Sequence, residues 1–136
     1  MSKLIDELKT DHVNLSSALC EVEKLGVTTA QGQAVLTEAK AALLAHLQKE
    51  DQEMYPLLRE AAKSDSSLQQ KLNSYAFDMT QVSQAVLAFF AKYEGNVQSP
   101  DIEKDFREIY LALTKRIISE ESKLFPEYDR LVVQRS

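Results

Sequence analysis

The sequence predicts an all-α protein, an antiparallel up-down-up-down four-helix bundle, and three observations support that prediction. Apolar residues recur at steps of three and four through four long segments, which is helical spacing. Only three glycines and three prolines interrupt 136 residues, so the chain has few turns. The stretches between the segments are short, and short connections place consecutive helices antiparallel. We expect a single domain over residues 1–136, which is long enough for one hydrophobic core.

The first two helices are expected at about residues 3–25 and 30–63. Gly26 is a typical stop for the first helix. Pro56 should kink or locally unwind the second, because proline has no N–H to donate. The apolar stripes contain Leu4, Leu8, His12, Leu15, Leu19 and Val22 in the first helix, and Leu36, Ala39, Leu43, His46, Glu50, Met54 or Glu53, and Leu57 in the second. Two histidines and Glu50 therefore occupy core positions.

The other two helices are expected at about residues 68–94 and from Ser99 onward. Gly95 ends the third helix, and Ser99 followed by Pro100 is typical of a helix start. Pro126 should bend the fourth helix. The stripes contain Leu68, Leu72, Tyr75, Met79, Val82, Val86, Phe89 or Phe90, and Tyr93 in the third helix, and Ile102, Phe106, Ile109, Leu113, Arg116 or Ile117, Glu120 and Leu124 in the fourth.

Composition excludes several classes of function. The net charge of −5 argues against a nucleic-acid-binding surface, which needs clustered Lys and Arg. No apolar run reaches the roughly 20 residues of a membrane span, and the first residues lack the apolar region of a signal peptide. Cys20 is the only cysteine, which suits a reducing compartment, and we interpret it as a small buried core residue. We expect a cytoplasmic protein that binds neither membranes nor nucleic acid.

A charged pattern occurs twice, on the second and fourth helices. The first copy is His46-Leu-Gln-Lys-Glu50 followed by Tyr55-Pro56, and the second is Arg116-Ile-Ile-Ser-Glu120 followed by Phe125-Pro126. The glutamate and the aromatic–proline pair are kept, whereas the histidine of the first copy is an arginine in the second. A charged pair that recurs inside an apolar stripe is not expected by chance, and it indicates a functional or structural site in the core.

Residues equally far from a connecting turn lie at the same height in antiparallel helices. Counting from the expected turns at about 1.5 Å per residue brings the polar stripe positions within roughly one helical turn of each other. They are His12, His46, Glu50, Met79, Arg116 and Glu120. A buried charge without a partner is unfavourable by several kcal/mol, so these groups need partners. A metal ion that accepts nitrogen and oxygen donors, such as iron, manganese or zinc, is one solution.

These motifs together resemble the hemerythrin-like HHE cation-binding domains, over essentially the whole chain. The matching elements are Asp11-His12, the H-x-x-x-E of His46 and Glu50, and Glu120-Glu121 ahead of Leu124-Phe125-Pro126. The resemblance implies a non-haem iron protein for oxygen binding, oxygen or redox sensing, iron handling, or repair of nitrosatively damaged iron centres. It implies that the metal ligands are His12, His46, Glu50 and Glu120, with Asp78 and Tyr75 as weaker candidates.

Three positions depart from the family's pattern. Arg116 and Met79 stand where relatives supply histidines, and Tyr75 stands at a further histidine position. The chain has only two histidines, so we expect a depleted site rather than the full di-iron centre of an oxygen carrier. Met79 and Tyr75 are most simply core residues.

The same residues also allow a metal-free interpretation. Arginine cannot ligate a metal, but it can form a bidentate pair with a carboxylate. We therefore interpret Arg116 as a structural counter-ion to Glu50 or Glu120. The two negative charges of these glutamates are then balanced by Arg116 and one protonated histidine, so the net charge of the cluster is near zero. We expect the acidic residues Asp51, Glu53 and Glu121 on a solvated face.

We expect a non-enzymatic hemerythrin-like cation-binding protein that senses or regulates oxygen, redox or iron status, with a regulatory protein as partner. The alternative is a metal-free four-helix regulator that acts by protein interaction. Histidine phosphotransfer is a third interpretation, because His46 is followed three residues later by Lys49. Glu50 argues against it, since that motif has glycine there. No glycine-rich loop or nucleophile–histidine pair indicates an enzyme.

Overall fold

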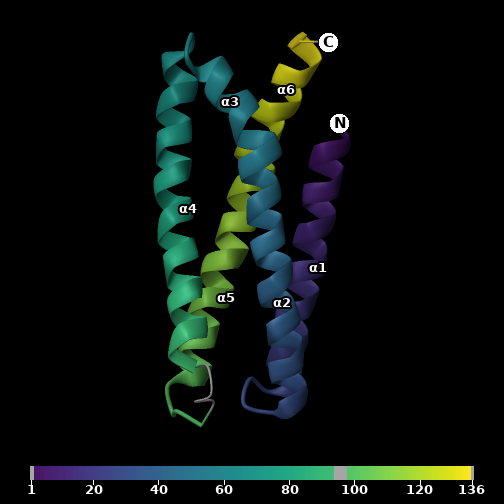
Figure 1. The fold of residues 1–136 in the computed structure, drawn as a ribbon, viewed down its shortest axis with the longest axis vertical. Helices are drawn as coiled ribbons and strands as arrows, with labels where there is room; N and C mark the ends of the chain where they lie inside the picture. The colour runs from purple at the N-terminus through teal and green to yellow at the C-terminus, as the bar shows by residue number, and fades with distance from the viewer. Residues whose placement is uncertain (1, 94–97, 136) are drawn as a thin grey trace.

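The computed structural model describes residues 2–93 and 98–135, and it confirms the antiparallel four-helix bundle (Figure 1). In chain order the elements are α1 (Lys3–Leu25), α2 (Ala30–Lys49), the π-helical turn η1 (Glu50–Met54), α3 (Tyr55–Ala62), α4 (Ser66–Tyr93), α5 (Ile102–Ser119), the π-helical turn η2 (Glu120–Leu124) and α6 (Phe125–Arg135). Within the described ranges, no helix combines the length and apolar character that crossing a membrane requires.

Two helical hairpins pack together. α1 lies beside α2, and α4 lies beside α5, while α1 also contacts α5. Figure 1 shows the start of α1 and the end of α6 at one end of the molecule, and the α1–α2 turn with the neighbouring ends of α4 and α5 at the other, which we call the connection end. The short helices α3 and α6 continue the second member of each hairpin, and α3 carries the chain across to α4.

Side-chain caps and one tight turn fix the first hairpin. The hydroxyl of Ser2 accepts from the N–H of Ile5 at 3.2 Å, and the hydroxyl of Thr29 accepts from the N–H of Gly32 at 2.9 Å. Gly26 ends α1 with a φ of 95°, a conformation that favours glycine. A Cβ on Gly32 would lie 1.9 Å from the carbonyl oxygen of Gly26. The close approach of α1 and α2 at this turn therefore depends on both glycines.

The core consists of two apolar clusters separated by a polar layer. One cluster lies toward the connection end of the bundle and includes Leu19, Leu36, Phe89 and Phe106. The other lies toward the chain ends and includes Ile5, Leu58, Leu72, Phe125 and Leu131. The buried polar or charged residues of the described chain fall between the two clusters, and they are His12, His46, Glu50, Arg116 and Glu120.

A π-turn interrupts each of the two proline-containing arms. The N–H of Tyr55 bonds to the carbonyl of Glu50, and the N–H of Phe125 bonds to the carbonyl of Glu120, each five residues back. A proline ring clashes with the carbonyl four residues earlier in a regular α-helix, and the widened turn relieves that clash. The predicted interruption at the prolines is confirmed, although it takes the form of a π-turn. Such turns are frequent at functional sites.

Several details differ from the sequence prediction. Leu58, rather than Leu57, is buried in α3, and Cys20 is half-buried rather than buried. Ile5, rather than Leu4, is the fully buried residue at the start of the α1 stripe. α5 begins at Ile102, because Pro100 and Asp101 form a turn before the helix. Tyr75, Met79 and Val82 in the middle of α4 are only half-buried. The predicted stop at Gly95 lies outside the described residues.

Candidate metal centre

The polar layer surrounds one small cavity inside the bundle, with a volume of about 20 Å³. All six residues predicted to share one zone line this cavity, which confirms their convergence. They are His12, His46, Glu50, Met79, Arg116 and Glu120. The remaining walls are apolar apart from Ser83, and they include Leu43, Leu47, Val82 and Leu113.

Two imidazoles from α1 and α2 meet at the centre of this layer. The Nε2 atoms of His12 and His46 lie 3.1 Å apart, and both residues are buried. Glu120 Oε1 lies 3.0 Å from His12 Nε2 and 3.9 Å from His46 Nε2. Potential ligand atoms of these three residues all lie within 4.8 Å of one another. The arrangement is a group of two histidines and one carboxylate from three different elements.

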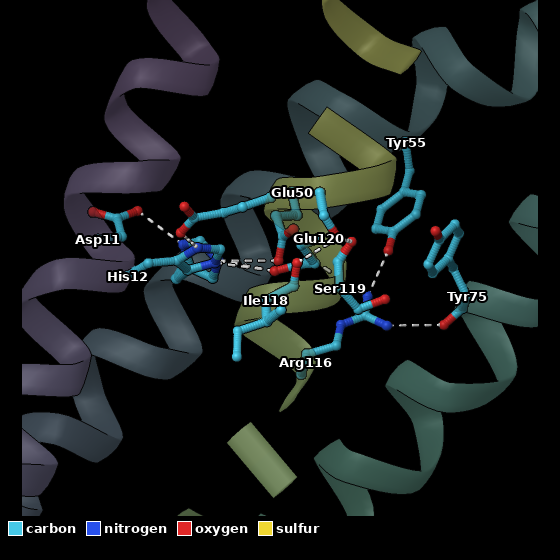
Figure 2. Close-up of polar contacts among 12 residues, drawn as sticks. Asp11, His12, Glu50, Tyr55, Tyr75, Arg116, Ile118, Ser119 and Glu120 are labelled. Carbon is cyan, nitrogen blue, oxygen red and sulfur yellow. Dashed lines mark hydrogen bonds and ion pairs between the residues drawn. The ribbon is translucent and has the colours of Figure 1, made fainter. Parts of the chain in front are cut away.

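The outer nitrogen of each imidazole is held by a second carboxylate. His12 Nδ1 donates to Glu121 Oε2 at 2.7 Å, and His46 Nδ1 donates to Asp11 Oδ2 at 3.0 Å. Lys49 Nζ lies 3.2 Å from the same Asp11 oxygen. Figure 2 shows Asp11 and His12 on the same side of the layer. Histidines that ligate metals usually donate their other N–H to a carboxylate, which fixes the tautomer and the ring orientation.

This pairing has a direct consequence at the centre. A carboxylate accepts hydrogen bonds, so each Nδ1 carries a proton, and a neutral imidazole then presents a lone pair at Nε2. Two such lone pairs facing each other at 3.1 Å repel unless a positive charge lies at the centre. A proton on one Nε2 provides that charge in the simplest way, and a metal ion provides more of it. The outer carboxylates therefore orient both imidazoles toward a cation.

Glu50 adds a buried carboxyl group that interacts with His46 and Glu120. Its side chain is 0% exposed, and one oxygen lies 3.1 Å from His46 Nε2 without hydrogen-bond geometry. Among the described residues, neither oxygen of Glu50 has a hydrogen-bond partner. A buried carboxylate without hydrogen bonds is strongly unfavourable unless it is protonated or meets a cation. Glu50 is thus available as a further ligand.

The group fits a divalent metal ion. Ligand atoms about 2.1 Å from an ion and at right angles to each other lie about 3.0 Å apart. The contacts of His12 Nε2 with His46 Nε2 and with Glu120 Oε1 have nearly this length, 3.1 and 3.0 Å. Two imidazoles with one carboxylate form the donor set used by mononuclear non-haem Fe(II) centres. His12, His46, Glu120 and Glu50 would hold the ion.

Charges divide unequally between the two central carboxylates. Burial raises the pKa of Glu50 to about 8. Burial acts the same way on Glu120, but hydrogen bonds with the two imidazoles outweigh it and lower the pKa of that carboxyl. Burial opposes the charging of His46, yet its contacts with Glu120 and Glu50 prevail and raise the pKa of the imidazole to about 10. Without a metal at neutral pH, Glu120 is ionised and His46 is protonated.

Arg116 occupies the opposite side of Glu120 from His12, as Figure 2 shows. Its Nη2 lies 3.3 Å from Glu120 Oε2 and donates to the hydroxyl of Tyr55 at 3.0 Å. Its Nη1 donates to the carbonyl of Tyr75 at 3.2 Å. The predicted ion pair of Arg116 is thus present with Glu120, whereas no contact with Glu50 is seen within the described part of the chain.

The weaker ligand candidates lie away from the imidazoles. Asp78 is exposed and lines a surface groove between α4 and the arm formed by α5, η2 and α6. The ring of Tyr75 borders the same groove, and its hydroxyl interacts with Ser119. Met79 borders the cavity as a half-buried residue. The phosphotransfer interpretation requires an exposed histidine, so the burial of His46 excludes it.

Sequence reasoning missed part of the site. Glu121 is expected on a solvated face, and its side chain is 36% exposed, but the prediction did not include the hydrogen bond that its carboxylate accepts from His12 Nδ1. The signal was present in the sequence, since both carboxylates that hold the imidazoles are chain neighbours of site residues, Asp11 beside His12 and Glu121 beside Glu120. No sequence pattern indicated the hydroxyl of Tyr55 as the partner of Arg116.

The fold and the site define a helical bundle with a buried group of residues that could hold a cation. The model of the hemerythrin HHE cation binding domain matches residues 3–128. The chain therefore belongs to this family, as its motifs predicted. No curated protein and no solved structure matches it.

Proposed function

We propose that this protein binds a single non-haem metal ion, preferentially iron, and senses or regulates oxygen, redox or iron status. The observation that carries the proposal is the 3.1 Å approach of two buried Nε2 atoms whose rings are each anchored through Nδ1 by a carboxylate. Such anchoring orients both rings toward a common cation and supports binding without rearrangement.

Each residue of the proposed site has a different role in binding the ion. His12 and His46 supply neutral nitrogen donors, and Glu120 supplies an oxygen between them and Arg116. Glu50 releases its proton when a cation arrives, because a carboxyl with a pKa near 8 is largely protonated at neutral pH in the cation's absence. A bound iron ion would supply a redox couple and a coordination position for a small molecule.

The size of the cavity supports a sensing or regulatory role rather than enzymatic turnover. A volume of about 20 Å³ accommodates a molecule of about the size of water. The apolar side chains of Leu15, Leu47 and Val86 line it, and apolar walls favour a small neutral molecule over a polar organic substrate. A change at the ion would reach a partner protein through the helices that hold the ligands.

A metal-free regulator is the second candidate, and one observation favours it. The pKa of His46 is raised to about 10, so a proton can supply the central positive charge in place of a metal. Arg116 compensates Glu120 at the same time. In this alternative the polar layer is structural, and the protein would act through its surface.

Metal analysis separates the two candidates. The full chain is purified without metal-chelating resin, loaded anaerobically with Fe(II), and examined by elemental analysis and by its absorption spectrum before and after exposure to air. One tightly bound ion and a spectrum that responds to air support the first candidate. Less than about 0.1 ion per chain, with no tight binding of Fe(II), Mn(II) or Zn(II) on reconstitution, would leave only the metal-free regulator.

The variant His46→Gln tests whether the ion lies at the proposed place. Glutamine removes the imidazole donor but keeps a polar side chain of similar length, so binding should weaken by at least about 100-fold. Gln48→Ala serves as a control, because that exposed residue of α2 faces away from the cavity. Equal affinity of His46→Gln and the parent protein would place the ion elsewhere.

A further inference from the structure

Residues 46 and 116 occupy matching positions in two equivalent stretches of backbone. Each lies one helical turn before a buried glutamate that begins a π-turn. Both side chains line the same cavity, yet the first is an imidazole and the second a guanidinium. One half of the layer therefore carries a metal donor, and the other half carries a permanent positive charge.

The guanidinium of Arg116 is surrounded as a bound cation would be. It contacts three oxygen atoms from three different elements, and its side chain is 6% exposed. The atoms are Glu120 Oε2 from η2 at 3.3 Å, the hydroxyl of Tyr55 from α3 at 3.0 Å and the carbonyl of Tyr75 from α4 at 3.2 Å. Carboxylate, hydroxyl and carbonyl oxygens are the partners of a hard cation. Arginine keeps its charge throughout the physiological pH range.

The aromatic residues that follow the two π-turns also differ between the two halves of the polar layer. Phe125, which follows the second turn, stacks on the ring of His12 with centroids 5.4 Å apart. Tyr55, which follows the first turn, faces Arg116 and offers it a hydroxyl. The ring beside the guanidinium thus carries an oxygen acceptor, whereas the ring beside the imidazole carries none. In this half of the polar layer, the hydroxyl of Tyr55 therefore accepts a hydrogen bond from the permanent positive charge of Arg116.

We propose that Arg116 is a built-in second cation that limits this centre to one exchangeable metal ion. The inference rests on the proposed cation-binding function. Glu120 directs Oε1 to His12 and Oε2 to Arg116, so its second oxygen is already engaged by a charge that does not dissociate. A second metal ion would compete with the guanidinium for that oxygen and would meet like charge at close range. Arg116 is therefore the residue that determines how many ions the site accepts.

Replacing Arg116 by histidine tests the inference. The full chain and the variants are loaded anaerobically with excess Fe(II), freed of loose metal and analysed for bound metal per chain. We expect one ion in the parent protein and two in Arg116→His, because the variant removes the charge and adds a donor. Arg107→His is the matched control, since Arg107 is an exposed arginine of the same helix, and it should retain one ion.

A second pair of variants covers the case in which Arg116→His does not fold. Arg116→Lys keeps the charge, whereas Arg116→Gln removes it, and affinity for the first ion is measured with Mn(II). We expect Arg116→Gln to bind at least about tenfold more tightly than Arg116→Lys, because a nearby positive charge opposes a metal cation. Equal affinities of this pair would contradict the inference.

The number of bound ions per chain distinguishes a failure of the proposed role of Arg116 from a failure of the proposed metal-binding function. One ion in both the parent protein and Arg116→His would overturn the role of Arg116 and leave the proposed function intact. Two ions in the parent protein would also overturn the proposed role of Arg116. An absence of bound metal in the parent protein would overturn the proposed function, and that result is obtained before any variant is examined.

Discussion

Glu120 and Glu121 are neighbours in the chain, and they contact opposite nitrogens of one imidazole. Glu120 Oε1 lies 3.0 Å from His12 Nε2, and Glu121 Oε2 lies 2.7 Å from His12 Nδ1. Glu120 is buried, whereas Glu121 is partly exposed at the margin of the site. Two adjacent residues of η2 therefore have different contacts, Glu120 as a proposed metal ligand and Glu121 as the residue that positions the His12 ring.

Neutralising these two glutamates should give two distinct losses. Glu121→Gln weakens the anchor of His12 and should lower metal affinity by about 10–100-fold, the range for loss of an outer-shell partner. Glu120→Gln removes a ligand oxygen's charge and should lower affinity further. Titration with Mn(II) followed by calorimetry measures both. A larger loss in Glu121→Gln than in Glu120→Gln would contradict these assignments.

Glu50 should reduce the stability of the metal-free protein while supporting metal binding. Its carboxyl is buried, its oxygens lack hydrogen-bond partners among the described residues, and its pKa is raised to about 8. Glu50→Gln should therefore stabilise the metal-free fold by about 1 kcal/mol or more at pH 9, where the native carboxyl is ionised, and should weaken metal binding. Thermal unfolding at this pH measures the first effect. Glu53→Gln, an exposed position in the same π-turn, should change neither quantity, and destabilisation by Glu50→Gln would show that the carboxylate has an unrecognised partner.

The stability of the metal-free protein should fall as pH rises above neutrality. The folded-state pKa of His46 is raised from 6.5 to about 10, so protonation stabilises the fold fully below the unfolded value and is lost as pH rises through about 10. The raised pKa of Glu50 acts in the same direction between 4.5 and about 8. The lowered pKa of Glu120 acts in the opposite direction, but its loss occurs only in acid.

Between pH 6 and 9, the free energy of unfolding should therefore decrease by about 6 kcal/mol, with about half from His46 and about half from Glu50. Urea denaturation of metal-free protein at several pH values measures this decrease. A metal-loaded sample is the control, because a bound ion replaces the proton and should flatten the dependence. A rise in stability with pH over this window would contradict the proposed protonation of His46 and Glu50.

Metal binding should release protons. At pH 7 the cation-free site holds one proton on His46 and most of one on Glu50, given pKa values of about 10 and about 8. Coordination requires both groups to be deprotonated, so about two protons should leave for each ion bound. Calorimetric titration in buffers of different ionisation enthalpy counts them. Release of no protons would mean that the ion avoids both residues.

The sequence predicted the polar layer because helical rise is fixed. His12, His46 and Glu120 fall at heights that depend only on the length of each helix and the position of each turn, and the turns were marked by Gly26 and a serine-rich loop. Convergence on one cavity followed from that arithmetic.

The parts that could not be predicted depend on interactions across the bundle. Apolar periodicity does not distinguish a π-turn from a kink, so only the prolines marked the interruptions. The hydrogen bond between Glu121 and His12 likewise joins η2 to α1 across the bundle, so helical periodicity alone does not indicate it. The hydroxyl of Tyr55 and the carbonyl of Tyr75 become partners of Arg116 only through tertiary packing, which one sequence does not encode locally.

The repetition of helix, helix, π-turn and short helix along the described chain has a consequence for protein design. Residues 1–63 contain His12, His46 and Glu50, and all three reach the middle of the bundle from one half of the chain. We expect two copies of that half, joined in tandem, to form a symmetric bundle with four inward histidines and with no counterpart of Arg116. Such a duplicate would offer twice as many imidazole donors as the natural chain, and would turn an asymmetric centre into a two-fold one.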